Sequence, residues 1–127
     1  MSAGDGDDHV QTNDHSVVDG GAGDDTIQVR SSSTVTGGAG NDSISVTGDG
    51  TTINFAKGDG NDIVDLNNHS VDFTISGYSL NDVVVTQQAG KAIVNFKGSD
   101  DSLTFDLGGI GSARLSFADS ASVDIKA

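Results

Sequence analysis

A six-residue, glycine-rich motif ending in aspartate recurs along the first half of the chain, and we call each copy a hexad. The final aspartates of four hexads are residues 8, 25, 42 and 62, so the steps between them are 17, 17 and 20 residues. A short fixed period of this kind is typical of solenoids, in which each repeat forms one coil that stacks on the next. The hexads are AGDGDD, GGAGDD, GGAGND and KGDGND, and a fifth, degenerate copy, GYSLND, ends at Asp82.

Two short segments of alternating apolar and polar residues lie between successive hexads. Alternation at period two predicts strands with one face turned inward, so each period is strand, turn, strand, turn. We expect the three extra residues of the later coils to lie in the connections opposite the hexads, at 47–52 and 67–72. The expected inward ladders are Val10, Ile27, Ile44 and Val64 on one side, and Val18, Val35, Phe55 and Ile75 on the other.

The last third of the chain has longer, more apolar alternating segments and no glycine hexad. Strands are expected at 83–86, 91–96, 102–107, 113–117 and 122–125. The links at 88–90, 98–101, 108–111 and 119–120 are of a turn type that favours antiparallel pairing. The open end of a solenoid exposes unpaired backbone, so this part is expected to cap the stack, and folding is expected to begin there.

Together these patterns predict an all-β fold. We expect a right-handed parallel β-roll, a β-solenoid of about four coils, in residues 1–82. An antiparallel β capping segment is expected in residues 83–127, in one continuous structural unit with the roll.

The hexads have the chemistry of a metal-binding turn. Glycine at alternate positions allows positive φ angles and lets several carbonyl oxygens converge on one point. Ca²⁺ prefers six to eight such oxygen ligands, and the final aspartate supplies the anionic one. Stacked turns lie about 4.8 Å apart, so an ion between two hexads can take a carboxylate from each. Four hexads leave three gaps, and we expect about three Ca²⁺ ions in one column, held by Asp8, Asp25, Asp42 and Asp62 and by the turn residues Gly4, Gly6, Gly20, Gly21, Ala22, Gly23, Gly37, Gly38, Ala39, Gly40, Gly58 and Gly60.

The composition indicates that this fold needs the metal. The net charge is −13, every acidic residue is aspartate, cysteine is absent and only 34% of the residues are hydrophobic. Two carboxylates about 5 Å apart repel by roughly 3 kcal/mol at an effective dielectric constant of about 20. We therefore expect binding energy to become folding energy, with the metal-free array unfolded. The acidity argues against nucleic acid or an anionic membrane as a partner.

Two segments match a known repeat at every position. Residues 20–28 and 37–45 fit the nonapeptide GGxGxDxUx, in which U is a large apolar residue, and residues 3–11 and 57–65 depart from it only at their first residue. The chain thus resembles the repeats-in-toxin (RTX) family of haemolysin-type calcium-binding repeats. Residues 82–105 are similar to the strand-rich unit that often follows the last repeats of that family.

The resemblance implies a Ca²⁺-binding β-roll in a bacterial protein that is exported by type I secretion and folds outside the cell. We also expect a monomeric module at the C-terminal end of a larger protein, with further domains upstream and no cleavable N-terminal signal. Family arrays commonly carry hexads on both edges of the roll, whereas here only one edge has them. Asp14, Asp49 and Asp72 are accordingly expected to be solvated turn residues.

Two other functions are compatible with the sequence. An adhesive, carbohydrate-binding or ice-binding module would need an exposed regular array, for which Thr34, Thr36, Thr51 and Thr52 are a hint. The chain is otherwise a non-catalytic module of a secreted protease, lipase or polysaccharide-modifying enzyme. We expect no enzymatic activity in the chain itself, because its histidines, His9, His15 and His69, are scattered and no catalytic motif accompanies them.

Overall fold

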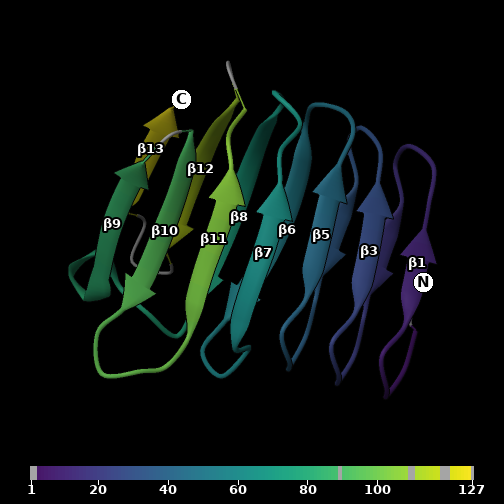
Figure 1. Cartoon of the computed structure of the whole chain (residues 1–127), viewed down its shortest axis with the longest axis horizontal. Helices are drawn as coiled ribbons and strands as arrows, with labels where there is room; N and C mark the ends of the chain where they lie inside the picture. Colours follow the sequence, from purple (N-terminus) through teal and green to yellow (C-terminus); the bar gives the residue numbers. More distant parts are fainter. Residues whose placement is uncertain (1–2, 89, 109–110, 118–120, 127) are drawn as a thin grey trace.

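Two β-sheets face each other along the whole chain, and the strands of the roll alternate between them (Figure 1). The computed structural model describes residues 3–88, 90–108, 111–117 and 121–126. Within those ranges the only helical element is a single 3₁₀ turn, η1 (Leu80–Asp82). No helix in this part of the chain is long and apolar enough to cross a membrane.

The front sheet of Figure 1 has seven strands, in the order β1-β3-β5-β7-β11-β10-β9. They are β1 (His9–Gln11), β3 (Thr26–Val29), β5 (Ser43–Val46), β7 (Asn61–Asp65), β9 (Val83–Gln88), β10 (Lys91–Phe96) and β11 (Ser102–Asp106). The second sheet has six strands, in the order β13-β12-β8-β6-β4-β2. These are β2 (Val17–Asp19), β4 (Thr34–Thr36), β6 (Thr51–Ala56), β8 (Ser70–Ser76), β12 (Ser112–Phe117) and β13 (Ser122–Lys126).

Parallel pairing of successive coils confirms the predicted β-roll. β1, β3, β5 and β7 pair in parallel in the first sheet, as do β2, β4, β6 and β8 in the second. The first inward ladder is also confirmed, since its four members are in register and buried. The ladder continues into the next strand, where Phe105 pairs with Val64.

The second inward ladder differs from the prediction after its second member. Val35 pairs with Ile53, and Ile53 pairs with Phe73, whereas Phe55 and Ile75 form a further ladder of their own. The offset is 18 residues from Val35 to Ile53 but 20 from Ile44 to Val64. One extra residue therefore lies before Ile53 and two lie between Ile53 and β7, so β6 lengthens on the hexad side. The expectation that all three extra residues of this coil lie in the connection at 47–52 was wrong. A shift of two residues keeps the same face inward, which is why alternation alone could not detect it.

The C-terminal part is antiparallel only in β9, β10 and β13. β10 pairs antiparallel with β9 and β11, and β13 pairs antiparallel with β12. In contrast, β11 pairs in parallel with β7, and β12 pairs in parallel with β8. The prediction of a wholly antiparallel segment after residue 82 therefore needs correction, because these two strands add a fifth coil. Residue 89 and the links at 109–110 and 118–120 lie outside the described residues.

The core between the sheets becomes bulkier toward the C-terminal end. The first coils bury aliphatic residues such as Val10 and Val18. The later coils bury stacked aromatic rings, with centroids 5.2 Å apart for Phe73 and Phe105 and 5.3 Å apart for Phe55 and Phe96. Burial of each large apolar side chain contributes about 1.5–3 kcal/mol. The first hexads thus lie beside the thinnest part of the core.

Candidate metal-binding turns

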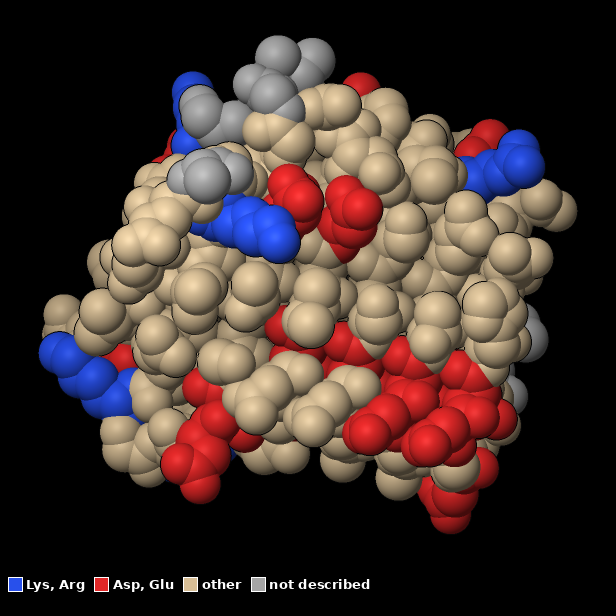
Figure 2. All heavy atoms as spheres, viewed as in Figure 1, with Lys and Arg blue, Asp and Glu red and all other residues tan. Residues whose placement is uncertain are grey.

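The four hexads lie on one edge of the roll, because the first three directly precede β1, β3 and β5 and the fourth runs into the start of β7, all strands of the first sheet. In Figure 2 the aspartate side chains gather along the lower edge of the molecule, below these strands in Figure 1. The hexads are thus stacked one above another, as their constant register in the sheet requires.

Close stacking of the turns explains the glycines. Gly38 and Gly40 have φ angles of +90° and +119°, which side chains rarely tolerate. A Cβ placed on Gly38 would lie 2.2 Å from the carbonyl oxygen of Gly21 in the turn before it. Positive φ angles are also found at Gly4, Gly6, Gly21, Gly23, Gly58 and Gly60.

The final aspartates of the hexads, Asp8, Asp25, Asp42 and Asp62, form a continuous file. Oδ1 of Asp25 accepts the main-chain amide of Asp8 at 2.9 Å, and Oδ1 of Asp42 accepts that of Asp25 at 2.9 Å. Oδ1 of Asp62 accepts the amide of Asp42 at 3.0 Å. Asp25, Asp42 and Asp62 are only 1%, 2% and 4% exposed. Each carboxylate therefore ties its own turn to the preceding one through one oxygen.

The second oxygen of three of these carboxylates is buried and unpartnered. Oδ2 of Asp8, Asp25 and Asp42 makes no hydrogen bond with any described residue. A Cβ added to Gly20 would lie 2.5 Å from Oδ2 of Asp25, and one added to Gly37 would lie 2.4 Å from Oδ2 of Asp42, so the first residue of the hexad must be glycine to leave room for this oxygen. A buried charged oxygen without a partner is strongly unfavourable. A bound cation would remove that cost.

The pKa values of the file show the same imbalance. Burial raises the pKa of Asp62 to about 8 and that of Asp42 to about 6. The amide hydrogen bonds oppose this shift, and the neighbouring carboxylates add to it. Burial likewise raises the pKa of Asp25. Asp62 therefore tends to hold a proton at neutral pH, and Asp42 begins to bind one just below it.

Main-chain oxygens would have to complete any metal site. Among the described residues, no group of three or more histidine or aspartate side chains could hold a metal ion. The carbonyls of Ala22 and Ala39, which we expected to be ligands, accept the amides of Gly6 at 2.8 Å and Gly23 at 2.9 Å. A carbonyl oxygen has a second lone pair, so these bonds do not prevent coordination. Carboxylate and carbonyl oxygens are the ligands that suit Ca²⁺.

A second file lies beside the first and hydrogen-bonds in the opposite direction. Asp24 N–H donates to Oδ1 of Asp7 at 2.8 Å, Asn41 N–H donates to Oδ1 of Asp24 at 2.7 Å, and Asn61 N–H donates to Oδ1 of Asn41 at 3.0 Å. These residues are exposed. The occurrence of either Asp or Asn as the fifth hexad residue is the sequence signal for this role, because an amide oxygen accepts such a bond as well as a carboxylate does.

The acidic residues away from the hexads make local contacts. Asp14 and Asp49 are exposed; Asp14 accepts the amide of Ser31, and Asp49 bonds His69 and Ser70. Asp72 is exposed but lies within β8, so its predicted place in a turn was wrong. The degenerate hexad does not extend the file: Asp82 lies in η1 and accepts the amide of Ser79.

The threonines noted in the sequence do not form a uniform outward row. Thr34 pairs with Thr52, but the same row continues with Val17 on one side and Asp72 on the other. Thr51 is buried, and its hydroxyl donates to the carbonyl of Arg30. Thr36 pairs with Asn54.

Comparison with known proteins identifies the fold. No family model matches the chain, and no curated protein sequence matches it. The crystal structure of the extracellular lipase LipA from Serratia marcescens is similar, with a TM-score of 0.66 and 24% sequence identity. The match covers 92% of this chain but only 18% of the lipase chain. The fold of this protein, two sheets of parallel coils, thus also occurs within a much longer chain.

Proposed function

We propose that this chain is a calcium-binding module of the RTX type that folds when Ca²⁺ occupies its hexad turns. The observation that carries the proposal is the set of buried, unpartnered Oδ2 atoms on Asp8, Asp25 and Asp42. Each belongs to a turn whose other candidate ligands are main-chain carbonyls, so all of these ligand atoms would be oxygen. About three ions, one in each gap between consecutive hexads, would give the unpartnered carboxylate oxygens of the file a ligand partner.

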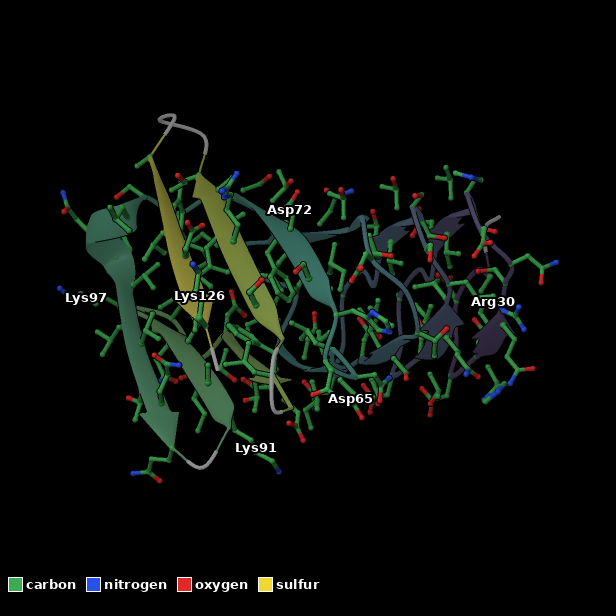
Figure 3. The ribbon with its side chains drawn as sticks, turned by 90° about the horizontal axis from the view of Figure 1, so that it is seen from above. Arg30, Asp65, Asp72, Lys91, Lys97 and Lys126 are labelled. Atoms are coloured by element: carbon green, nitrogen blue, oxygen red, sulfur yellow. The ribbon has the colours of Figure 1, made fainter. Side chains whose placement is uncertain are left out.

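The distribution of positive charge supports an external cation. The ion pairs among the described residues are Arg114–Asp124 and His69–Asp49, and neither includes a residue of the file. Figure 3 places Lys91, Lys97 and Lys126 at the C-terminal end of the molecule and Arg30 near the other end. Among the residues that the structure describes, no basic side chain forms an ion pair with the file, and in a protein with a net charge of −13 a divalent ion would provide the missing charge.

Circular dichroism and calorimetric titration test the proposal with two matched variants. We expect the first three turns of the wild type to be unstructured in chelator and the whole roll to be β-rich in millimolar Ca²⁺. Asp25→Asn removes a ligand charge and should weaken Ca²⁺ binding strongly. Asp24→Asn keeps the oxygen that accepts the Asn41 amide and should bind about as many ions as the wild type. Identical spectra of the wild type in chelator and in Ca²⁺ would refute the proposal.

We further propose that the chain is part of a larger secreted bacterial protein, where it acts as a non-catalytic folding module beside a domain such as a hydrolase. The likeness to 18% of an extracellular lipase chain supports this, together with the RTX resemblance. Type I export of the whole protein follows from the same resemblance. The test is to introduce Asp25→Asn and Asp42→Asn into the full-length protein: export should continue, while the folded fraction in the medium falls.

A further inference from the structure

The degenerate fifth hexad does not stack on the fourth, and the fourth turn is completed instead by a residue about 40 positions away. Asp101 is 8% exposed. Its Oδ2 accepts the amide of Gly58 at 2.7 Å, and its Oδ1 accepts the amide of Gly60 at 3.0 Å. Tyr78 donates its hydroxyl hydrogen to the same carboxylate. Gly58 and Gly60 have φ angles of +94° and +92°, so both amides are directed at one anion, a main-chain nest.

The same amide has a different acceptor in the earlier turns. Gly23 N–H donates to the carbonyl of Ala39 in the next turn at 2.9 Å, and Gly40 N–H donates to the carbonyl of Asp59 at 3.2 Å. In the fourth turn the equivalent amide, that of Gly60, donates to the carboxylate of Asp101 instead. Asp101 therefore stands where the next turn of the stack would be.

Asp101 also differs from the aspartate file in how its oxygens are used. Each of its oxygens has at least one donor, whereas Asp25 and Asp42 each keep one buried oxygen without any. Its charge is thus stabilised by fixed donors of the protein and does not need a bound cation.

The carboxylate is anchored to the aromatic part of the core. The ring of Tyr78 stacks on Phe96 with centroids 4.2 Å apart, and Phe96 stacks on Phe55 in β6. Nζ of Lys57, the first residue of the fourth hexad, lies 5.7 Å from the centroid of the Tyr78 ring. The turn and the C-terminal strands are therefore joined through one packed cluster.

We propose that Asp101 terminates the cation column by holding the fourth turn in its binding conformation without a metal ion. The inference rests on the proposed function, since it concerns where the column of ions ends. The fourth turn then provides one preformed half of the site for the last ion, which binds between the third and fourth hexads. The number of ions stays at three because the carboxylate that follows Asp62 in the stack, that of Asp101, is already bound by protein donors.

Amide hydrogen exchange on the whole 127-residue chain, in chelator and in Ca²⁺, tests this directly. In chelator, the amides of Gly58 and Gly60 should be at least tenfold protected relative to an unfolded chain, and those of Gly21 and Gly23 should be unprotected. Asp101→Asn should abolish the protection, because an amide group offers only one acceptor oxygen. The matched control is Asp100→Asn, which removes the charge of the exposed neighbour and should leave the protection unchanged.

Calcium titration of the same samples separates this inference from the proposed function. Wild type should bind three ions, and Asp101→Asn should bind two with near-normal affinity and lose the last. If Asp101→Asn unfolds, Tyr78→Phe provides the second variant, because it removes one donor but keeps the stacked ring, and it should lower the protection of Gly58. Unprotected Gly58 and Gly60 in wild type, a fourth wild-type ion, or three ions in Asp101→Asn would overturn the role of Asp101. Absence of any Ca²⁺ binding by wild type would instead overturn the proposed function.

Discussion

Oδ1 of Asp42 accepts the main-chain amide of Asp25 at 2.9 Å, while Oδ2 of the same carboxylate is buried without a partner. One oxygen thus stacks the coils, and the other is left for a ligand from outside the protein. The same division of roles is found in Asp25, whose Oδ1 accepts the amide of Asp8. The hydrogen bond to Oδ1 does not offset the cost of burying the charged Oδ2 atom. The following predictions derive from that uncompensated charge.

Asp42→Ala should remove more than one Ca²⁺ ion. Asp42 lies between two gaps of the file, so its loss affects the ions on both sides as well as the bond to Asp25. Isothermal titration should give about one ion where the wild type binds about three. Asp72→Ala is the control, because Asp72 is exposed on β8, and it should leave the stoichiometry unchanged. Loss of a single ion would show that the ligands are not shared.

Acid should partly replace calcium. The pKa values of Asp42 and Asp62 in the folded protein are about 6 and about 8, above the value of about 3.9 for an unfolded aspartate. Protons therefore bind the folded state more tightly. Their contribution to stability is complete below about pH 4 and is lost as the pH rises through 6 and 8.

The metal-free protein should thus gain β-structure when the pH is lowered from 8 to 5, as followed by circular dichroism in chelator. Calcium affinity should change in the opposite sense. It should decrease as the pH is lowered, by up to about tenfold per pH unit for each proton that Ca²⁺ displaces. Asp42→Asn should reduce both effects. A metal-free protein that loses structure on acidification over this range would contradict the prediction.

Gly38→Ala should prevent the second and third turns from stacking. The new Cβ would lie 2.2 Å from the Gly21 carbonyl, and the residue would keep a φ angle of +90°. Gly98→Ala is the matched control: its φ angle is +74°, but no atom lies within 4 Å of the new Cβ. Backbone strain alone costs about 1–3 kcal/mol. Thermal unfolding in Ca²⁺ should therefore show a modest loss of stability for Gly98→Ala and a much larger loss of stability for Gly38→Ala.

Truncation of the core should have unequal effects at the two ends of the roll. Phe105 is fully buried and stacked on Phe73, and Phe105→Ala should cost about 3–5 kcal/mol and unfold the roll even in Ca²⁺. Val10→Ala should loosen only the first coil. Hydrogen exchange resolves the two cases, with the fourth coil better protected than the first in wild type. The reverse order of protection would show that folding does not start at the C-terminal end.

The register of the C-terminal strands illustrates what could not be predicted from local patterns. Strand positions such as β10 (Lys91–Phe96) were predicted correctly, because alternation is a property of neighbouring residues. The parallel pairing of β11 with β7 was not, since Leu103 and Phe105 would alternate in the same way in either direction. Val35 pairs with Ile53 instead of the expected Phe55 for the same reason, because both residues lie on the inward face of β6.

The amino-acid sequence by itself determined the coils, their period and the single edge that carries the hexads, because glycine turns and period-two strands are local chemistry. It also determined which aspartates form the file, since each ends a hexad. Only the tertiary structure decided the register of the second sheet, the fifth coil and the place of Asp101. These depend on which distant strands share hydrogen bonds, and many pairings would bury the same faces.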